Sequence, residues 1–239
     1  MKVVIAHLGP IAELIAATSI NKGIKKQSVK TNITWVVLDE YKYVFKFNKN
    51  VEKVFSQKEF EEQEGQYDLF INLWPAIVKS KVSVREYMGF GFYDEFKQFE
   101  GAFLNTHSFP KMSNFQLYFR LAGLIWRGEG YDIGYYPKTK TKKNRIGMSA
   151  VNANLRNYVL DNLEIDDKKI WYIPYKKNIF KKIDEINRCK KIITDDSLTL
   201  HLSLVLRKQV YYLETYPQML KIEFFNKGQL YSVPYNYVR

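Results

Sequence analysis

Short apolar runs and longer amphipathic stretches alternate along the first half of the chain. Residues 3–8 and 32–38 are apolar runs with the length of buried strands, and residues 54–56 and 67–73 repeat the pattern. Between the first two runs, residues 11–25 carry apolar side chains at helical spacing. Strands separated by helices predict right-handed βαβ units that form a parallel sheet.

The same alternation restarts in the second half. Strands are expected over residues 146–151, 169–175, 191–194 and 209–213, and helices over residues 154–163, 179–188 and 197–206. Two successive βαβ blocks predict an α/β fold made of two Rossmann-like domains. Ligands of such folds bind at the carboxyl ends of the strands, so we expect the two domains to face each other across a cleft that holds the site.

A polar, basic stretch separates the two blocks. Residues 137–145 are rich in lysine and threonine and have the composition of an interdomain linker. We therefore expect one domain over residues 1–136 and a second over residues 146–214. The aromatic tail, residues 215–239, has no clear pattern, and we interpret it as a segment that packs back across the domains.

The region before this stretch is aromatic and contains one clear helix. Apolar side chains recur at helical spacing from Ser113 to Trp126, and the predicted apolar face includes Tyr118. Neither a Gly-x-Gly-x-x-Gly motif nor a Walker A motif occurs in the sequence. This argues against ordinary dinucleotide binding and P-loop chemistry.

The composition indicates the cellular compartment of the protein and excludes some kinds of site. The apolar start of the chain is too short for a signal peptide, and no stretch approaches the roughly 20 apolar residues of a membrane span. A single cysteine, Cys189, forms no internal disulfide, and three scattered histidines suggest no zinc-type cluster. We expect a cytoplasmic protein; the inner membrane surface and the cytoplasm of a phage-infected cell are two settings that stay open.

The charge suggests an anionic partner. The 37 lysines and arginines exceed the 25 aspartates and glutamates by 12. A protein this basic often meets nucleic acid, an anionic membrane face or a phosphorylated substrate. Lysine-rich solubility explains the charge equally well.

The first candidate site lies where the first predicted strand turns into a helix. Gly9 lets the backbone turn tightly and approach a ligand, and Glu13 falls in the first helical turn. A carboxylate there can act as a general base toward an acceptor hydroxyl, or can simply complement the helix dipole. His7 and His107 are further side chains that could face this site.

The second candidate site spans the end of a later strand and the start of a helix. Asp196 or Ser197 can cap that helix, and free backbone N–H groups beside the cap would hold a diphosphate. Thr194 and Thr199 add hydroxyl groups, and His201 lies one helical turn beyond Ser197. An ordinary N-cap explains the same residues without a ligand, except for His201.

Together the two sites resemble the heptosyltransferases, which are inverting glycosyltransferases of the GT-B fold. That family begins with a strand followed by Leu-Gly-x-x-Gly-Asp, and residues 8–13 of this chain are Leu-Gly-Pro-Ile-Ala-Glu. The family also carries Asp-Ser-Gly-x-x-His before a helix, and residues 196–201 are Asp-Ser-Leu-Thr-Leu-His. The order of predicted elements agrees along most of the chain.

The resemblance implies a division of roles. Glu13 takes the position of the catalytic base, and residues 1–136 form the acceptor-side domain. Asp196, Ser197, Thr199 and His201 lie where the family binds the diphosphate and sugar of its donor, so residues 146–214 form the donor-nucleotide-binding domain. The implied reaction is a single inverting displacement from a nucleotide-sugar, with neither a metal nor another cofactor.

Three departures from the family pattern keep a second hypothesis open. Glu13 replaces the aspartate and moves the carboxylate out by one methylene, Ala12 replaces a glycine, and Leu198 replaces the glycine next to the phosphate. The chain is also shorter than typical family members. A catalytically inactive nucleotide-sugar-binding or assembly protein with the same fold is the alternative. Glu214, at the end of the last clear strand, could hold a ribose hydroxyl.

The acceptor has two candidate classes, both polyanionic. The family usually glycosylates a phosphorylated lipopolysaccharide core, whereas some small basic glycosyltransferases modify hydroxymethylated phage DNA. A solvated aromatic subdomain that binds no polyanion fits the region 79–120 as well. The candidate polyanion-binding residues are Lys79, Lys81, Arg85, Lys111, Arg120, Lys142 and Lys143.

Overall fold

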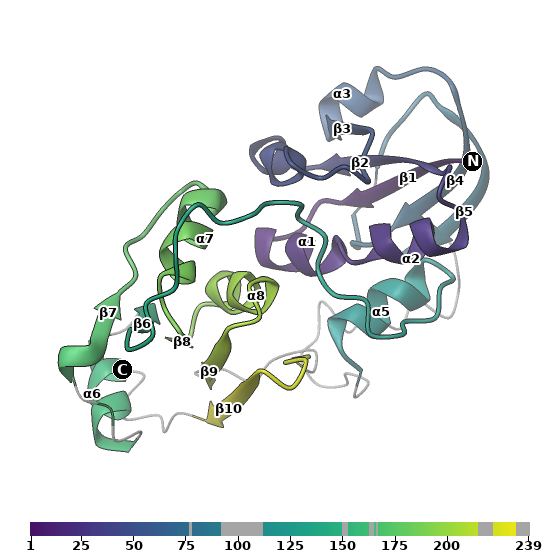
Figure 1. The fold of residues 1–239 in the computed structure, drawn as a ribbon. Helices are drawn as coiled ribbons and strands as arrows, with labels where there is room; N and C mark the ends of the chain where they lie inside the picture. Colours follow the sequence, from purple (N-terminus) through teal and green to yellow (C-terminus); the bar gives the residue numbers. More distant parts are fainter. Residues whose placement is uncertain are drawn as a thin grey trace. The chain divides into compact units, whose positions relative to one another are not determined.

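The computed structural model describes residues 1–76, 78–91, 112–149, 153–162, 165, 167–214 and 222–232. The chain divides into two compact units. Unit 1 comprises Met1–Gly134 with Met219–Glu223, and unit 2 comprises Tyr135–Gln218 with Phe224–Arg239. Each unit has a five-stranded parallel sheet with helices (Figure 1), which confirms the predicted α/β class.

Unit 1 has its strands in the order β3-β2-β1-β4-β5, and all neighbouring strands are parallel. The strands are β1 (Lys2–His7), β2 (Asn32–Val37), β3 (Lys53–Ser56), β4 (Gln66–Asn72) and β5 (Ser83–Gly89). The helices are α1 (Ile11–Ala17), α2 (Ile20–Gln27), the 3-10 helix η1 (Asp39–Phe45), α3 (Gln57–Glu61) and α5 (Asn114–Leu121).

Alternate residues of β1 face opposite layers of unit 1. Val4 and Ala6 pack in a cluster with Phe60 of α3, whereas His7 contacts Tyr118 of α5 on the other face. In Figure 1, α3 lies on one side of this sheet and α1, α2 and α5 lie on the other. Because β1 is buried on both faces, its apolar run is continuous rather than alternating.

Local side-chain hydrogen bonds set several helix boundaries. The single helix predicted over residues 11–25 is two helices, because the hydroxyls of Thr18 and Ser19 donate to the carbonyls of Ile15 and Ala16 at the break. A capping box between Ser113 and Gln116 starts α5. The helix predicted to reach residue 126 ends at Leu121.

The strand β5 was not predicted. It is an edge strand with mostly exposed or half-exposed residues, so its apolar signal is weak. Gly89 ends it with φ +95°, and a Cβ there would lie 2.0 Å from the carbonyl oxygen of Asn72. Only glycine fits this approach of β5 to β4 without a backbone shift.

Unit 2 has its strands in the order β10-β9-β8-β6-β7, again all parallel. The strands are β6 (Ile146–Ser149), β7 (Ile170–Tyr172), β8 (Lys191–Thr194), β9 (Gln209–Glu214) and β10 (Gly228–Ser232). The helices are α6 (Ala153–Asn162), the 3-10 helix η2 (Asp167–Lys169), α7 (Ile179–Asn187) and α8 (Ser197–Val205). Met148 and Ile193 of the sheet form a buried cluster with Val159 of α6.

Two segments of unit 2 have structure that the sequence did not indicate. The stretch predicted as a linker, residues 137–145, is hydrogen-bonded along α7: the backbone N–H of Lys138 donates to Asp184 at 2.8 Å, and the amide of Asn187 donates to the Thr139 carbonyl at 2.7 Å. In the tail, β10 extends the sheet beside β9. Both segments gain their order from partners that are distant in sequence.

Each sheet has one point where the strand order reverses. In unit 1 the chain leaves β1 toward β2 on one side and later adds β4 on the other. In unit 2 the corresponding reversal lies between β6 and β8. Ligands of open parallel sheets bind outside the carboxyl ends of the strands at such a point. Among the helices of the described residues, none has the length and apolar character needed to cross a membrane.

Candidate functional site

In unit 1, Glu13 lies at the carboxyl edge of the sheet. It belongs to the first turn of α1, which follows directly from β1, and its side chain is half-buried. The hydroxyl of Tyr118 on α5 donates to Glu13 Oε2 at 2.8 Å. Burial, together with the charge and the hydrogen bond of Glu13, raises the pKa of Tyr118 well above its ordinary value. Tyr118 is therefore a neutral donor to the carboxylate.

His7 ends β1 beneath this carboxylate and is fully buried. Its ring lies 5.2 Å from the indole of Trp74 and 5.8 Å from the ring of Tyr118, measured between centroids. Burial lowers the pKa of His7 to about 3, so the imidazole is neutral at physiological pH. Neither ring nitrogen has a hydrogen-bond partner among the described residues. His7 therefore contributes no positive charge next to Glu13.

Gly9 is packed against an aromatic ring. A Cβ at this position would lie 2.4 Å from Cδ2 of Trp74, so the indole occupies the space that any side chain would need. The backbone N–H of Trp74 donates to Asn72 Oδ1 at 3.3 Å, at the carboxyl end of β4. The predicted role of Gly9, a close approach of the backbone to a ligand, stays a prediction.

In unit 2, Asp196 is the N-cap of α8. Its carboxylate accepts from the backbone N–H groups of Leu198 at 3.2 Å and Thr199 at 3.1 Å, and from the hydroxyl of Thr199. The cap itself satisfies these two amides, and the expectation that free N–H groups beside the cap hold a diphosphate stays a prediction. Ser197, in the first turn of α8, is half-buried.

A lysine that the sequence did not single out completes this cluster. Lys182 on α7 is 6% exposed, and its Nζ lies 2.7 Å from Asp196 Oδ2. Burial alone would raise the pKa of Asp196, but hydrogen bonds from Lys182 and Thr199 and the charge of Lys182 hold that pKa below its ordinary value. Asp196 is therefore ionised, and it forms an ion pair in which the lysine is buried and the carboxylate is half-buried.

The pair lies at the floor of a pocket of about 430 Å³ at the carboxyl edge of unit 2. Ser149, at the end of β6, and the start of α8 contribute polar groups to its wall. Tyr172 and Tyr175 contribute aromatic rings, and Tyr175 is 86% exposed. The pocket is thus lined by the buried ammonium group of Lys182 and by two tyrosines, and it lies beside the point where the strand order reverses.

The other predicted donor residues have different environments. Thr194 is fully buried, and its hydroxyl donates to the carbonyl of Ser149 at 2.7 Å. The hydroxyls of Ser149 and Thr199 lie 3.2 Å apart. His201 is buried one turn further along α8, and Glu214 is half-buried at the end of β9. Thr194, Thr199 and Asp196 are thus brought together with Ser149 and Lys182.

Structures of known proteins share this fold. E. coli heptosyltransferase WaaC with ADP-2-deoxy-2-fluoro heptose matches at TM-score 0.65 and 12% identity, over 99% of this chain and 94% of that chain. The chain has the fold of the heptosyltransferases. E. coli ADP-heptose LPS heptosyltransferase II matches at TM-score 0.60 and 10% identity, over 98% of this chain and 91% of that chain. The family 9 glycosyl transferase from Veillonella parvula DSM 2008 matches at TM-score 0.58 and 13% identity, over 89% of this chain and 80% of that chain.

No protein-family model matches the sequence, and no curated protein matches it. The predicted resemblance to the heptosyltransferases is therefore confirmed at the level of the fold, since identities this low show a shared fold alone. Any activity has to be argued from the residues of the site.

Within this heptosyltransferase fold the predicted polyanion-binding residues are dispersed. Lys79 and Lys81 are exposed in the segment between β4 and β5, and Lys142 and Lys143 are exposed in unit 2. Arg85 lines a shallow depression with Met1 and Gln66, at the amino-terminal edge of unit 1 and away from Glu13. Arg120 is exposed near the end of α5, and Lys111 lies outside the described residues.

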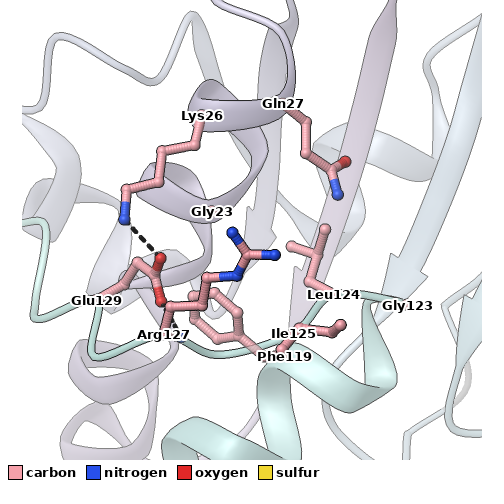
Figure 2. A pocket seen from close by; sticks show the side chains of 9 residues that line it. All are labelled: Gly23, Lys26, Gln27, Phe119, Gly123, Leu124, Ile125, Arg127 and Glu129. Atoms are coloured by element: carbon pink, nitrogen blue, oxygen red, sulfur yellow. Dashed lines mark hydrogen bonds and ion pairs between the residues drawn. The ribbon is translucent and has the colours of Figure 1, made fainter.

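A further pocket of about 280 Å³ lies between α2 and the segment after α5 (Figure 2). Gly23, Phe119 and Leu124 form its apolar floor, and Lys26 pairs with Glu129 at 2.6 Å at its rim. The last turn of α2 precedes the amino end of β2, so this pocket is not at the carboxyl edge. In the part of the chain that the structure describes, no three His, Cys, Asp or Glu side chains are grouped to hold a metal ion.

Proposed function

We propose that this protein is a glycosyltransferase that moves a sugar from a nucleotide-sugar donor to a hydroxyl of an acceptor. The observation that carries the proposal is the pocket at the carboxyl edge of unit 2, where the buried ammonium of Lys182 pairs with the cap of α8 and two tyrosines line the same pocket. An ammonium group with unused N–H donors can bind a phosphate group, and aromatic side chains can stack on a nucleobase. The heptosyltransferase fold supports the same assignment.

Nucleotides of the adenine series are the first candidates for the donor. One structural neighbour was solved with ADP-2-deoxy-2-fluoro heptose and another with ADP, so ADP is a suitable probe. In the proposal, the diphosphate contacts Lys182 and Ser149, and the nucleoside extends toward Tyr172 and Tyr175. Ser197, Thr199, His201 and Glu214 stay proposed donor contacts.

Glu13 of unit 1 is the proposed general base. It accepts a proton from the acceptor hydroxyl while that oxygen attacks the anomeric carbon, and the nucleoside diphosphate leaves from the opposite side with its electron pair. This single displacement inverts the configuration of the anomeric carbon and needs no metal ion in the proposal. Support comes from the position of Glu13 at a helix start on the carboxyl edge, where it has a neutral donor, Tyr118, and no ion pair with a described lysine, arginine or histidine.

The acceptor is proposed to be polyanionic. The support is the net charge of +12 and the exposed Lys79 and Lys81, in the segment that runs from the carboxyl end of β4 to the amino end of β5. Gel-shift titrations with duplex DNA containing hydroxymethylcytosine, and sedimentation with vesicles containing anionic glycolipid, separate the two candidate classes. Salt-dependent binding to one probe and not to the other would select it. Binding to neither would exclude a polyanionic acceptor.

Turnover decides between an enzyme and a binding protein. With water as the acceptor of the sugar, we expect release of nucleoside diphosphate from ADP-glucose, UDP-glucose or GDP-mannose, and loss of release in Glu13→Ala with unchanged ADP binding. The alternative, an inactive nucleotide-sugar-binding protein, is favoured by Leu198, whose side chain lines the pocket where the family has glycine. ADP binding without turnover by the wild type would support that alternative. Absence of both would overturn the proposal.

A further inference from the structure

The carboxylate of Glu13 is held by one buried side chain. Tyr118 has no solvent-exposed surface and donates its hydroxyl to Glu13 Oε2 at 2.8 Å. A buried hydroxyl that loses its acceptor carries a desolvation penalty, so the phenol resists any rotation of Glu13 away from it. Among the described residues, Glu13 Oε2 is the one acceptor that this hydroxyl contacts.

The geometry leaves the second carboxylate oxygen for chemistry. Glutamate has three side-chain torsions, so a free Glu13 would place its carboxylate in many positions at the start of α1. The bond from Tyr118 fixes Oε2, and Oε1 makes no hydrogen bond to a described residue. His7, whose ring lies beside Tyr118, is buried and neutral, so it adds no positive charge that would compete for this carboxylate.

We propose that Tyr118 is a positioning residue that fixes Glu13 so that its free oxygen accepts the proton of the acceptor hydroxyl. The inference rests on the proposed function, because it assigns Tyr118 a role in the reaction for which Glu13 is the base. Misplacing a catalytic group by about 1 Å can cost on the order of 100-fold in rate, so the restraint of a flexible side chain has a measurable effect. We expect the effect in kcat, since Tyr118 is fully buried and exposes no surface to a donor or an acceptor.

The test compares Tyr118→Phe with the same change at Tyr67. The assay is release of nucleoside diphosphate from ADP-glucose, UDP-glucose or GDP-mannose, whichever the wild type turns over. We expect Tyr118→Phe to lower kcat about 10-fold with KM for the donor unchanged, because the base is loosened but the donor site is untouched. Tyr67, at the amino end of β4, packs against Phe60, and its hydroxyl makes no hydrogen bond to a described residue. Tyr67→Phe should keep kcat within about two-fold.

A second pair of variants separates positioning from a general structural effect. The shorter carboxylate of Glu13→Asp no longer reaches the Tyr118 hydroxyl, so Tyr118→Phe should cost nothing further in a Glu13→Asp background. An equal loss in both backgrounds, or a Tyr118→Phe protein with wild-type kcat, would overturn the positioning role. A wild type without turnover would overturn the proposed function as well. Melting temperatures of all variants, measured by circular dichroism, exclude unfolding as the cause.

Discussion

Lys182 and Asp196 form an ion pair across two helices of unit 2, with Nζ and Oδ2 2.7 Å apart and the lysine side chain 7% exposed. The same Asp196 carboxylate caps α8 through the amides of Leu198 and Thr199. The pair therefore ties α7 to the first turn of α8, at the floor of the pocket that we assign to the donor. Its ammonium has three N–H donors, and Asp196 is the one acceptor that it contacts among the described residues, which leaves donors for a phosphate.

Removing this ammonium should weaken nucleotide binding. We expect Lys182→Met to lower the affinity for ADP roughly 10- to 100-fold, because a charge-assisted hydrogen bond contributes about 1.5–3 kcal/mol. Isothermal titration calorimetry with ADP measures the change. Lys181→Met is the matched control, since Lys181 is the exposed neighbour on α7 and should keep wild-type affinity. Equal affinities of the wild type and Lys182→Met would remove Lys182 from the donor site.

The ion pair should also make the free energy of unfolding depend on pH in the acidic range. The pKa of Asp196 is held below its ordinary value in the folded state, so its contribution is present above the unfolded pKa and is lost as pH falls through the folded pKa. Asp196→Asn keeps a good N-cap but has no charge to protonate. We expect the stability advantage of the wild type over Asp196→Asn to shrink between pH 6 and pH 3 in urea denaturation. A constant difference would contradict the predicted shift.

His7 predicts a separate loss of stability in acid. The pKa of His7 is about 3 in the folded state and about 6.5 in the unfolded state. Below pH 6.5 its imidazole therefore binds a proton in the unfolded chain but stays neutral in the folded chain. Between pH 7 and pH 4 this should cost on the order of 3 kcal/mol in the free energy of unfolding. The variant His7→Leu should lose that part of the pH dependence. Parallel pH profiles for the two proteins would show that His7 is protonated in the fold.

Gly9 predicts a packing defect that a second change can relieve. A Cβ at this position would meet the Trp74 indole at 2.4 Å, so Gly9→Ala should destabilise unit 1 by about 1–3 kcal/mol. The double variant Gly9→Ala with Trp74→Ala removes the collision, and we expect the cost of Gly9→Ala to fall below about 0.5 kcal/mol in that background. Thermal denaturation of the four proteins gives the coupling. If the free-energy changes of Gly9→Ala and Trp74→Ala simply add in the double variant, the indole does not pack against Gly9 in solution.

The local features of this protein could be predicted from its sequence. Apolar runs predicted four strands in the first half of the chain, and four strands and three helices in the second, because burial on both faces leaves a continuous apolar pattern. The helix start at Asp196 and the carboxylate in the first turn of α1 are likewise local, since a cap and its amides lie within three residues. The edge strands β5 and β10 were missed, because pairing rather than apolar pattern defines them.

What only the tertiary structure decided is which side chains meet. Tyr118 was assigned to an apolar helix face, and the fold places its hydroxyl on Glu13, 105 residues earlier in the chain. Lys182 looked like one lysine among many, and the packing of α7 on α8 buries it against Asp196. The reason is physical: helical and strand periods specify which residues are buried, but a hydrogen bond between two elements depends on the crossing and register that the whole core selects.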